Sequence, residues 1–278
     1  MRTLKNLSVF LGLSGLIWAQ ANTFKIGLVG APQTTWLLNQ EDMDAGPILD
    51  YKTTWGFMGG LSLAYHFSNY VGVGLDLLYS SEGQRYTGKD EALGLRWEGR
   101  TRLNYLKIPL LLRLGSDPES PVQLSFSLGP QLGLLLSAED KMTVKLGSSE
   151  LSLSTGNKEG ILYEVTPINP ERVSLNKPAY ASTTFGATVG LGVAIRLTES
   201  LHLSFQLRGD YTFTDIENKK AEYAHGTHTH SYWEQDIKYR SASHGGGGGQ
   251  NEPESERSPT AALTGGFVIG LTYLIPLQ

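Results

Sequence analysis

The chain has 278 residues, a net charge of −4 at neutral pH, 33 glycines and no cysteine. The lack of cysteine excludes disulfides, thiolate catalysis and thiolate metal sites, and the lack of clustered Lys and Arg argues against nucleic acid as a partner. Beyond the N-terminal segment no apolar run is long enough for a membrane-spanning helix, and no linker divides the chain, so we expect one domain.

The N-terminal segment has the form of an export signal. Arg2 and Lys5 precede an apolar run over 7–18, which is too short to cross a bilayer as a helix. Small residues at Ala19 and Ala21 suit signal peptidase. We therefore predict a signal peptide over 1–21 and a barrel domain over 22–278; the alternative, a buried N-terminal helix, lacks the polar spacing of an amphipathic helix.

Alternation of apolar and polar residues then recurs along the chain. It is strictest from Leu201 to Phe213, where every second residue except Gly209 is apolar. Such alternation is typical of a strand with one apolar and one polar face. The pattern occupies 23–30, 54–67, 70–80, 102–115, 121–136, 183–197, 200–214 and 263–275. We predict an all-β fold, an eight-stranded antiparallel up-and-down transmembrane β-barrel.

The connections alternate in length. Those at 68–70, 115–121 and 198–200 are short, whereas 31–53, 81–101, 137–182 and 215–262 are long and rich in Gly, Pro, Ser and charge. Short periplasmic turns and long extracellular loops are typical of outer-membrane barrels, and this asymmetry places both termini in the periplasm. Within the third long loop, 142–153 is expected to form a hairpin around Gly147-Ser148.

The composition of the polar face decides which face meets lipid. A soluble, lipocalin-like barrel would show the same alternation, but its exterior would carry many Lys and Glu. Here the polar face is dominated by small residues, among them Gly60, Ser62, Gly72, Gly74, Ser125, Ser127, Gly129, Gly186, Thr188, Gly192, Gly266, Gly270 and Thr272. We therefore place the apolar face outward in lipid and the small residues in a narrow lumen.

The predicted lumen also carries charge. Its larger polar side chains are Lys25, Asp76, Lys107, Arg113, Gln131, Arg196, His202, Gln206, Arg208 and Asp210. Enclosed charges must pair or stay hydrated, so we expect a salt-bridge network that braces the barrel; a narrow conduction path is the alternative. The short turns place Arg196 opposite His202, Gly190 opposite Arg208 and Asp76 opposite Ser62.

Three motifs carry a family resemblance: Tyr-Leu-Lys-Ile-Pro-Leu-Leu-Leu at 105–112, Gly-Pro-Gln-Leu-Gly at 129–133 and Gly-Val-Gly-Leu-Asp-Leu-Leu-Tyr-Ser at 72–80. With these the chain resembles the outer-membrane β-barrel domain family often labelled porin-like or PorT-like. The resemblance implies outer-membrane lipid as surroundings and barrel-assembly and secretion machinery as partners. Such barrels commonly end on an aromatic residue, whereas this chain ends at Gln278, so Tyr273 would have to serve in assembly.

No catalytic, cofactor or metal site is expected. Glycines 186, 190 and 192 lie inside a predicted strand, which is not the context of a dinucleotide loop. A tract of histidines at positions 225, 228, 230 and 244 could bind Zn²⁺ or Cu²⁺, but its spacing fixes no geometry. His66 and His202 lie at the periplasmic end, and Ser231, Glu234 and Asp236 form no recognisable triad with the loop histidines.

The long loops contain aromatic residues, namely Trp36, Trp55, Trp97, Tyr163, Tyr180, Tyr223, Tyr232 and Trp233. They could recognise an extracellular ligand or pack the loops onto the barrel rim. The sequence therefore predicts a structural, binding or secretion-associated barrel without catalysis. The alternatives are a narrow passive pore and a hydrolase with a site on the extracellular rim.

Overall fold

A computed structural model describes residues 23–45, 49–90, 94–116, 120–162, 171–225, 227–233 and 257–276. The predicted signal peptide lies outside these residues. The elements are β1 (Thr23–Leu38), α2 (Gln40–Asp44), β2 (Asp50–Lys52), β3 (Thr54–His66), β4 (Val71–Asp90), β5 (Leu95–Gly115), β6 (Val122–Leu146), β7 (Ser149–Thr155), β8 (Glu159–Leu162), β9 (Glu171–Ser174), β10 (Thr183–Arg196), β11 (Leu201–Thr212), β12 (Glu222–His225), β13 (His228–Ser231) and β14 (Ala261–Pro276).

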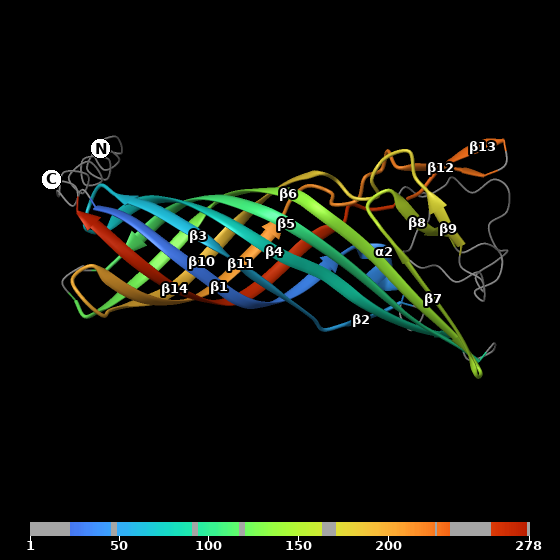
Figure 1. The fold of residues 1–278 in the computed structure, drawn as a ribbon, viewed down its shortest axis with the longest axis horizontal. Helices are drawn as coiled ribbons and strands as arrows, with labels where there is room; N and C mark the ends of the chain where they lie inside the picture. Colours follow the sequence, from blue (N-terminus) through green and yellow to red (C-terminus); the bar gives the residue numbers. More distant parts are fainter. Residues whose placement is uncertain are drawn as a thin grey trace, which may run out of the picture.

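The long strands close into a ring of antiparallel neighbours (Figure 1). The ring runs β1–β3–β4–β5–β6–β10–β11–β14 and returns to β1, where Thr23 faces Pro276. We call this end, which also holds the short connections, the turn end, and the opposite end the loop end. Closure leaves none of these strands with a free edge, as a barrel requires. The predicted antiparallel barrel is confirmed.

The predicted faces and register are also confirmed. Every strand of the ring exposes apolar side chains on its outer face, among them Leu28, Phe57, Val73, Leu110, Leu124, Leu191, Leu207 and Tyr273. The predicted pairs are all present, with Arg196 opposite His202, Gly190 opposite Arg208 and Asp76 opposite Ser62.

Two inward glycines of β4 make room for larger side chains on the neighbouring strands β3 and β5. A Cβ placed on Gly74 would lie 2.3 Å from Nε of Arg113, and one on Gly72 would lie 2.8 Å from Cγ of His66. Both distances are far below a normal contact, so these positions admit no side chain while Arg113 and His66 keep their places. The small-residue face is therefore what lets this narrow barrel hold charged groups.

Four strands run much further toward the loop end than predicted. β1, β4, β5 and β6 extend into the expected loops 31–53, 81–101 and 137–182, and β6 reaches 25 residues, against the roughly 9–11 that a tilted strand needs to cross a bilayer. The predicted hairpin around Gly147 is confirmed as β6 and β7, with Gly147 at φ +56° in the turn. The loop boundaries at 31, 81, 101 and 137 were therefore wrong.

These strands continue past the predicted boundaries because polar and apolar residues exchange faces there. The exchange is clearest on β5. From 106 to 114 its outer positions are Leu or Ile, but from 96 to 104 they are Arg96, Glu98, Arg100, Arg102 and Asn104. The inner face changes the opposite way, from Lys107 and Arg113 to the buried Leu95, Trp97, Leu103 and Tyr105. A β-bulge between Asn104 and Tyr105 marks the change. The strands thus leave an apolar surrounding and continue into water as a sheet with an apolar inner face.

Candidate functional site

The lumen contains a chain of charged side chains that alternate in sign. In order, they are Glu82, Lys107, Asp210, Arg208, Asp76 and Arg113. Lys107 contacts Glu82 and lies 3.2 Å from Asp210. Arg208 lies 3.0 Å from Asp210 and 3.2 Å from Asp76, and Arg113 lies 2.5 Å from Asp76. Acids and bases balance along this chain, which we call the ion chain, so its members neutralise one another in a buried place.

Neutral side chains add further hydrogen bonds to the ion chain. The Thr188 hydroxyl donates to Asp210 at 2.8 Å and lies 2.9 Å from the amide oxygen of Gln131. Arg113 also donates to the Ser62 hydroxyl at 2.9 Å. The residues that make these bonds lie on β3, β5, β6, β10 and β11. Together with the pair of Arg208 on β11 and Asp76 on β4, they join strands on opposite sides of the ring. Hydrogen-bonded networks of this kind rigidify a structure.

A second polar layer continues the network toward the loop end. Ser80 donates to Glu82 at 2.7 Å and accepts from the Gln33 amide at 2.9 Å. Gln33 donates again to the Ser81 carbonyl at 3.1 Å. Both Gln33 and Ser80 are buried. The lumen is therefore filled by paired groups from Arg113 up to Gln33.

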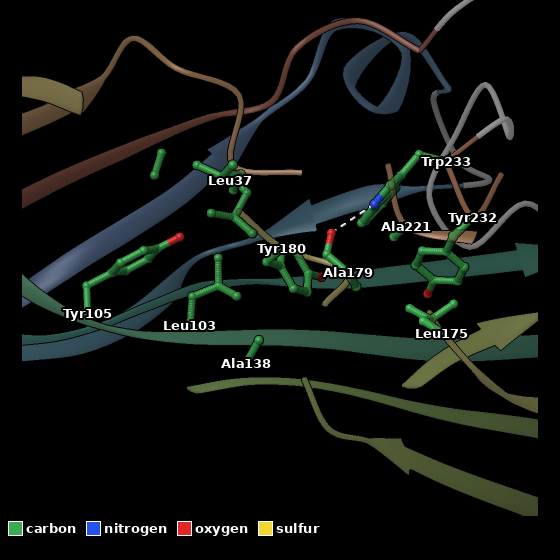
Figure 2. Packing of buried hydrophobic residues seen from close by; sticks show 12 residues of the cluster. Leu37, Leu103, Tyr105, Ala138, Leu175, Ala179, Tyr180, Ala221, Tyr232 and Trp233 are labelled. Atoms are coloured by element: carbon green, nitrogen blue, oxygen red, sulfur yellow. Dashed lines mark hydrogen bonds between the residues drawn. The ribbon is translucent and has the colours of Figure 1, made fainter. Parts of the chain in front are cut away.

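Above this layer an apolar cluster lies across the mouth of the barrel (Figure 2). Leu37 and Leu103 reach inward from β1 and β5, while Tyr180 and Trp233 come from the segments that follow β9 and β13. The Trp233 indole donates to the Ala179 carbonyl at 2.9 Å, and the rings of Tyr180 and Trp233 meet edge to face at 5.7 Å. The loop segments thus fold into the mouth and cap it.

A buried arginine joins three parts of this cap. Arg257, just before β14, makes two hydrogen bonds to Asp42 of α2, at 2.7 and 2.8 Å, and two to Glu217 after β11, at 2.8 and 3.0 Å. Asn39 starts α2 by accepting from the Glu41 and Asp42 amides, which holds Asp42 in place. Burial alone lowers the pKa of a guanidinium, but the bonds and charges of the two acids hold the pKa of Arg257 above its ordinary value.

A pocket of about 860 Å³ opens beside the cap at the loop end. Trp36 and Leu38 of β1, Met43 of α2 and Tyr51 of β2 line it, together with Trp97 of β5. Its charged lining comes from β2, β4 and β5 and consists of Asp50, Lys52, Lys89, Arg96 and Glu98. Aromatic rings beside mixed charges give the pocket both apolar area and groups that fix orientation.

The structure brings most of the predicted luminal residues together. The ion chain contains five of them, Asp76, Lys107, Arg113, Arg208 and Asp210, and Gln131 bonds to Thr188 beside it. Lys25, His202 and Gln206 line a cavity nearer the turn end. Arg196 is exposed at the turn end, because it is the last residue of β10 and lies at the rim.

Sequence reasoning missed Glu82, Gln33 and Arg257. Glu82 and Gln33 lay in expected loops. Glu82 nevertheless continues the alternation of Asp76, Leu78 and Ser80 on β4, and Gln33 continues the alternation of the inner face of β1. Arg257 carried no local signal, since Asp42 is 215 residues away from it and Glu217 is 40 residues away.

The aromatic residues of the expected loops serve several roles. Trp97, Tyr180, Tyr232 and Trp233 are buried, as the packing alternative predicts, whereas Trp55 is 67% exposed on the outer face of β3. Trp36 and Tyr51 line the pocket. Tyr163 lies outside the described residues.

The histidine tract is only partly described. The ring of His230 stacks on Tyr223, and His228 and His230 lie 6.4 Å apart. The His225 side chain and His244 lie outside the described residues. Within the part of the chain that is described, no group of three or more ligating side chains is assembled.

The family model named outer membrane protein beta-barrel domain matches residues 18–218. The chain belongs to this outer-membrane β-barrel family. The narrower PorT-like resemblance stays a prediction. No helix in the described residues is long and apolar enough to cross a membrane. No curated protein matched the sequence.

Several solved outer-membrane proteins resemble this barrel in fold. OprG from Pseudomonas aeruginosa has 14% identity and a TM-score of 0.39, with coverage of 94% of this chain and 100% of that one. Neisserial surface protein A has 13% identity and a TM-score of 0.36, with coverage of 90% and 96%. The protease OmpT from Escherichia coli has 8% identity and a TM-score of 0.40, with coverage of 93% and 98%. At these values the similarity does not assign a role.

Proposed function

We propose that this outer-membrane barrel acts by binding a ligand at its loop end, on the cell exterior, and that it neither conducts solute nor catalyses a reaction. The observation that carries the proposal is the filled lumen. The ion chain spans the interior from Arg113 to Glu82, and the apolar cluster around Trp233 lies above it. A solute would have to break both layers to pass.

The exposed apolar side chains of the ring between the turn end and the polarity exchange, which on β5 are those from 106 to 114, form an apolar belt, and the sheet above this belt supports the binding role. β4, β5, β6 and β7 carry it beyond the belt, and its inner face buries a second apolar cluster that includes Leu49, Tyr86, Trp97 and Met142. This cluster gives the loop end a core of its own, so its surface is held in one shape. Binding surfaces on such rigid scaffolds lose little conformational entropy when they are occupied.

The pocket beside the cap is the proposed binding site. Trp36 and Tyr51 offer ring surface, and Lys52, Lys89 and Glu98 offer hydrogen-bonding groups around it. This combination suits a carbohydrate of the cell surroundings, whose C–H faces stack on aromatic rings while its hydroxyls take polar contacts.

Two measurements test the proposal. The refolded barrel in planar bilayers is expected to show no conductance steps; a steady conductance at neutral pH would support the pore instead.

On a glycan array, labelled barrel is expected to bind a defined set of sugars, and the Trp36→Ala variant is expected to lose at least tenfold in affinity for them. Trp55→Ala is the matched control, because Trp55 is an exposed tryptophan on the outer face of β3 that does not line the pocket. Equal loss in both variants would refute the assignment of the pocket.

Barrel-assembly and secretion machinery remain proposed partners. The charged outer face of β5, from Arg96 to Arg102, is a surface that such a partner could contact without entering lipid. Pull-down from crosslinked outer membranes with wild type and with Arg100→Glu/Arg102→Glu would test this. A partner that is captured equally by both proteins would exclude the β5 face as its contact.

A further inference from the structure

The turn end of the lumen holds a cavity of about 140 Å³ whose charged and titratable lining is mostly basic. Lys25 of β1, His66 of β3, Arg113 of β5 and His202 of β11 line it, and each is placed on the inner face by the alternation of its strand. The remaining polar lining is uncharged apart from Asp76 and Arg208, and consists of Ser62, Gln123, Ser125, Ser127, Ser204, Gln206 and Thr272.

The charges around this cavity do not balance. Both carboxylate oxygens of Asp76 are engaged, one by Arg113 and one by Arg208. The ion chain is neutral as a whole, with its acids matched by bases. Among the described residues Lys25 has no acidic partner, and Arg113 adds to the positive potential at its ammonium group. The cavity therefore has an excess of positive charge inside a narrow barrel.

Side chains of the cavity lining also carry polar atoms without partners. Nδ1 of His66, Nε of Arg113 and Nε2 of His202 are buried and have no hydrogen-bond partner in the described part of the chain. His202 is 5% exposed. Buried polar groups without partners are uncommon in folded proteins, and each calls for a partner that completes it.

We propose that this cavity binds a free oxyanion of the size of phosphate or sulfate. Such an ion would neutralise Lys25 and accept hydrogen bonds from Arg113 and from the two histidines. The volume is suited to a small ion with a few waters, since a water occupies on the order of 30 Å³ in the liquid. The ring of strands separates the cavity from the surrounding lipid, which favours a free ion over a lipid headgroup. Bidentate and charge-assisted contacts of this type are the usual means by which proteins hold oxyanions.

The test uses the full refolded barrel in a zwitterionic detergent without lipid. Thermal and urea unfolding are followed in sodium phosphate, sodium sulfate and sodium chloride at equal ionic strength, and phosphate binding is measured by calorimetry. Wild type is expected to bind phosphate at millimolar concentration or tighter and to unfold at a higher urea midpoint in phosphate than in chloride. Equal midpoints and no calorimetric binding would overturn the proposal.

Variants distinguish the site from a general salt effect. Lys25→Gln is expected to fold as well as wild type in chloride, because it removes a cation without a partner, and to lose at least tenfold in phosphate affinity. Lys145→Gln is the matched control, since Lys145 is exposed on β6 and pairs with Glu150 far from the cavity. His202→Gln provides a second variant of the site. If phosphate protects Lys25→Gln and His202→Gln as strongly as it protects Lys145→Gln, the ion binds elsewhere and the proposal fails.

Discussion

The ion chain makes a quantitative prediction for Lys107. Its side chain is 4% exposed and that of Glu82 is 1% exposed, and Lys107 also lies 3.2 Å from Asp210. Lys107→Met leaves Glu82 buried without its cation, whereas Asp210 keeps Arg208 at 3.0 Å. Removing one partner of a buried pair costs about 3–5 kcal/mol, so we expect a loss of this size in the free energy of unfolding.

The double variant provides the decisive comparison. Lys107→Met/Glu82→Gln removes one charge of each sign and leaves Asp210, Arg208, Asp76 and Arg113 still alternating. It is expected to recover most of the loss, which gives a coupling energy of about 2–3 kcal/mol in a double-mutant cycle. Urea unfolding in lipid vesicles, followed by tryptophan fluorescence, measures all four proteins. If the double variant loses the sum of the single losses, the two side chains do not act as a pair and the ion chain is wrong.

Three further predictions concern the cap, the belt and pH. Arg257→Gln leaves Asp42 and Glu217 without their buried cation and should open the mouth, which faster proteolysis of the loop end would report; an unchanged cleavage rate would contradict this. Leu110→Arg should lower stability in lipid by about 2–4 kcal/mol, whereas Asn104→Arg at the polarity exchange should change it by about 0–1 kcal/mol; equal losses would contradict the boundary. Burial raises the pKa of Glu41, but its bonds with Ser258 outweigh this and hold the pKa below its ordinary value. Glu41 therefore contributes stability above its unfolded pKa and loses it as pH falls through the lower folded pKa, so hydrogen exchange at Ser258 should rise in that acidic range, and Glu41→Gln should abolish the dependence.

The barrel itself could be predicted because its determinant is local. Period-two alternation requires only neighbouring residues, and short turns transmit the register from one strand to the next, which is why Asp76 opposite Ser62 and Gly190 opposite Arg208 followed from the sequence. The same reasoning assigned most of the luminal charges to one face. It could not state which of them form pairs, because pairs such as Lys107 with Asp210 join positions 103 residues apart.

The loop end could not be predicted by the same rule. Strands were expected to end close to the last apolar outer positions, at 80 on β4 and at 102 on β5, yet the backbone continues with the faces exchanged. Charged residues at alternate positions, as in 96–102, are typical of a strand in water as well as of a loop. The cap depends on contacts such as Arg257 with Asp42, which only the closed ring brings together.

Cysteine scanning along β5 tests the central claim most directly, and the absence of native cysteine makes it clean. Spin labels placed one at a time at outer positions from 96 to 114 would be measured for collision with molecular oxygen and with a water-soluble nickel complex in lipid vesicles. We predict nickel access from 96 to 102, oxygen access from 106 to 114, and a change between them at 104. Uniform nickel access along the whole outer face would contradict the account, because the apolar side chains of this barrel would then not lie in lipid.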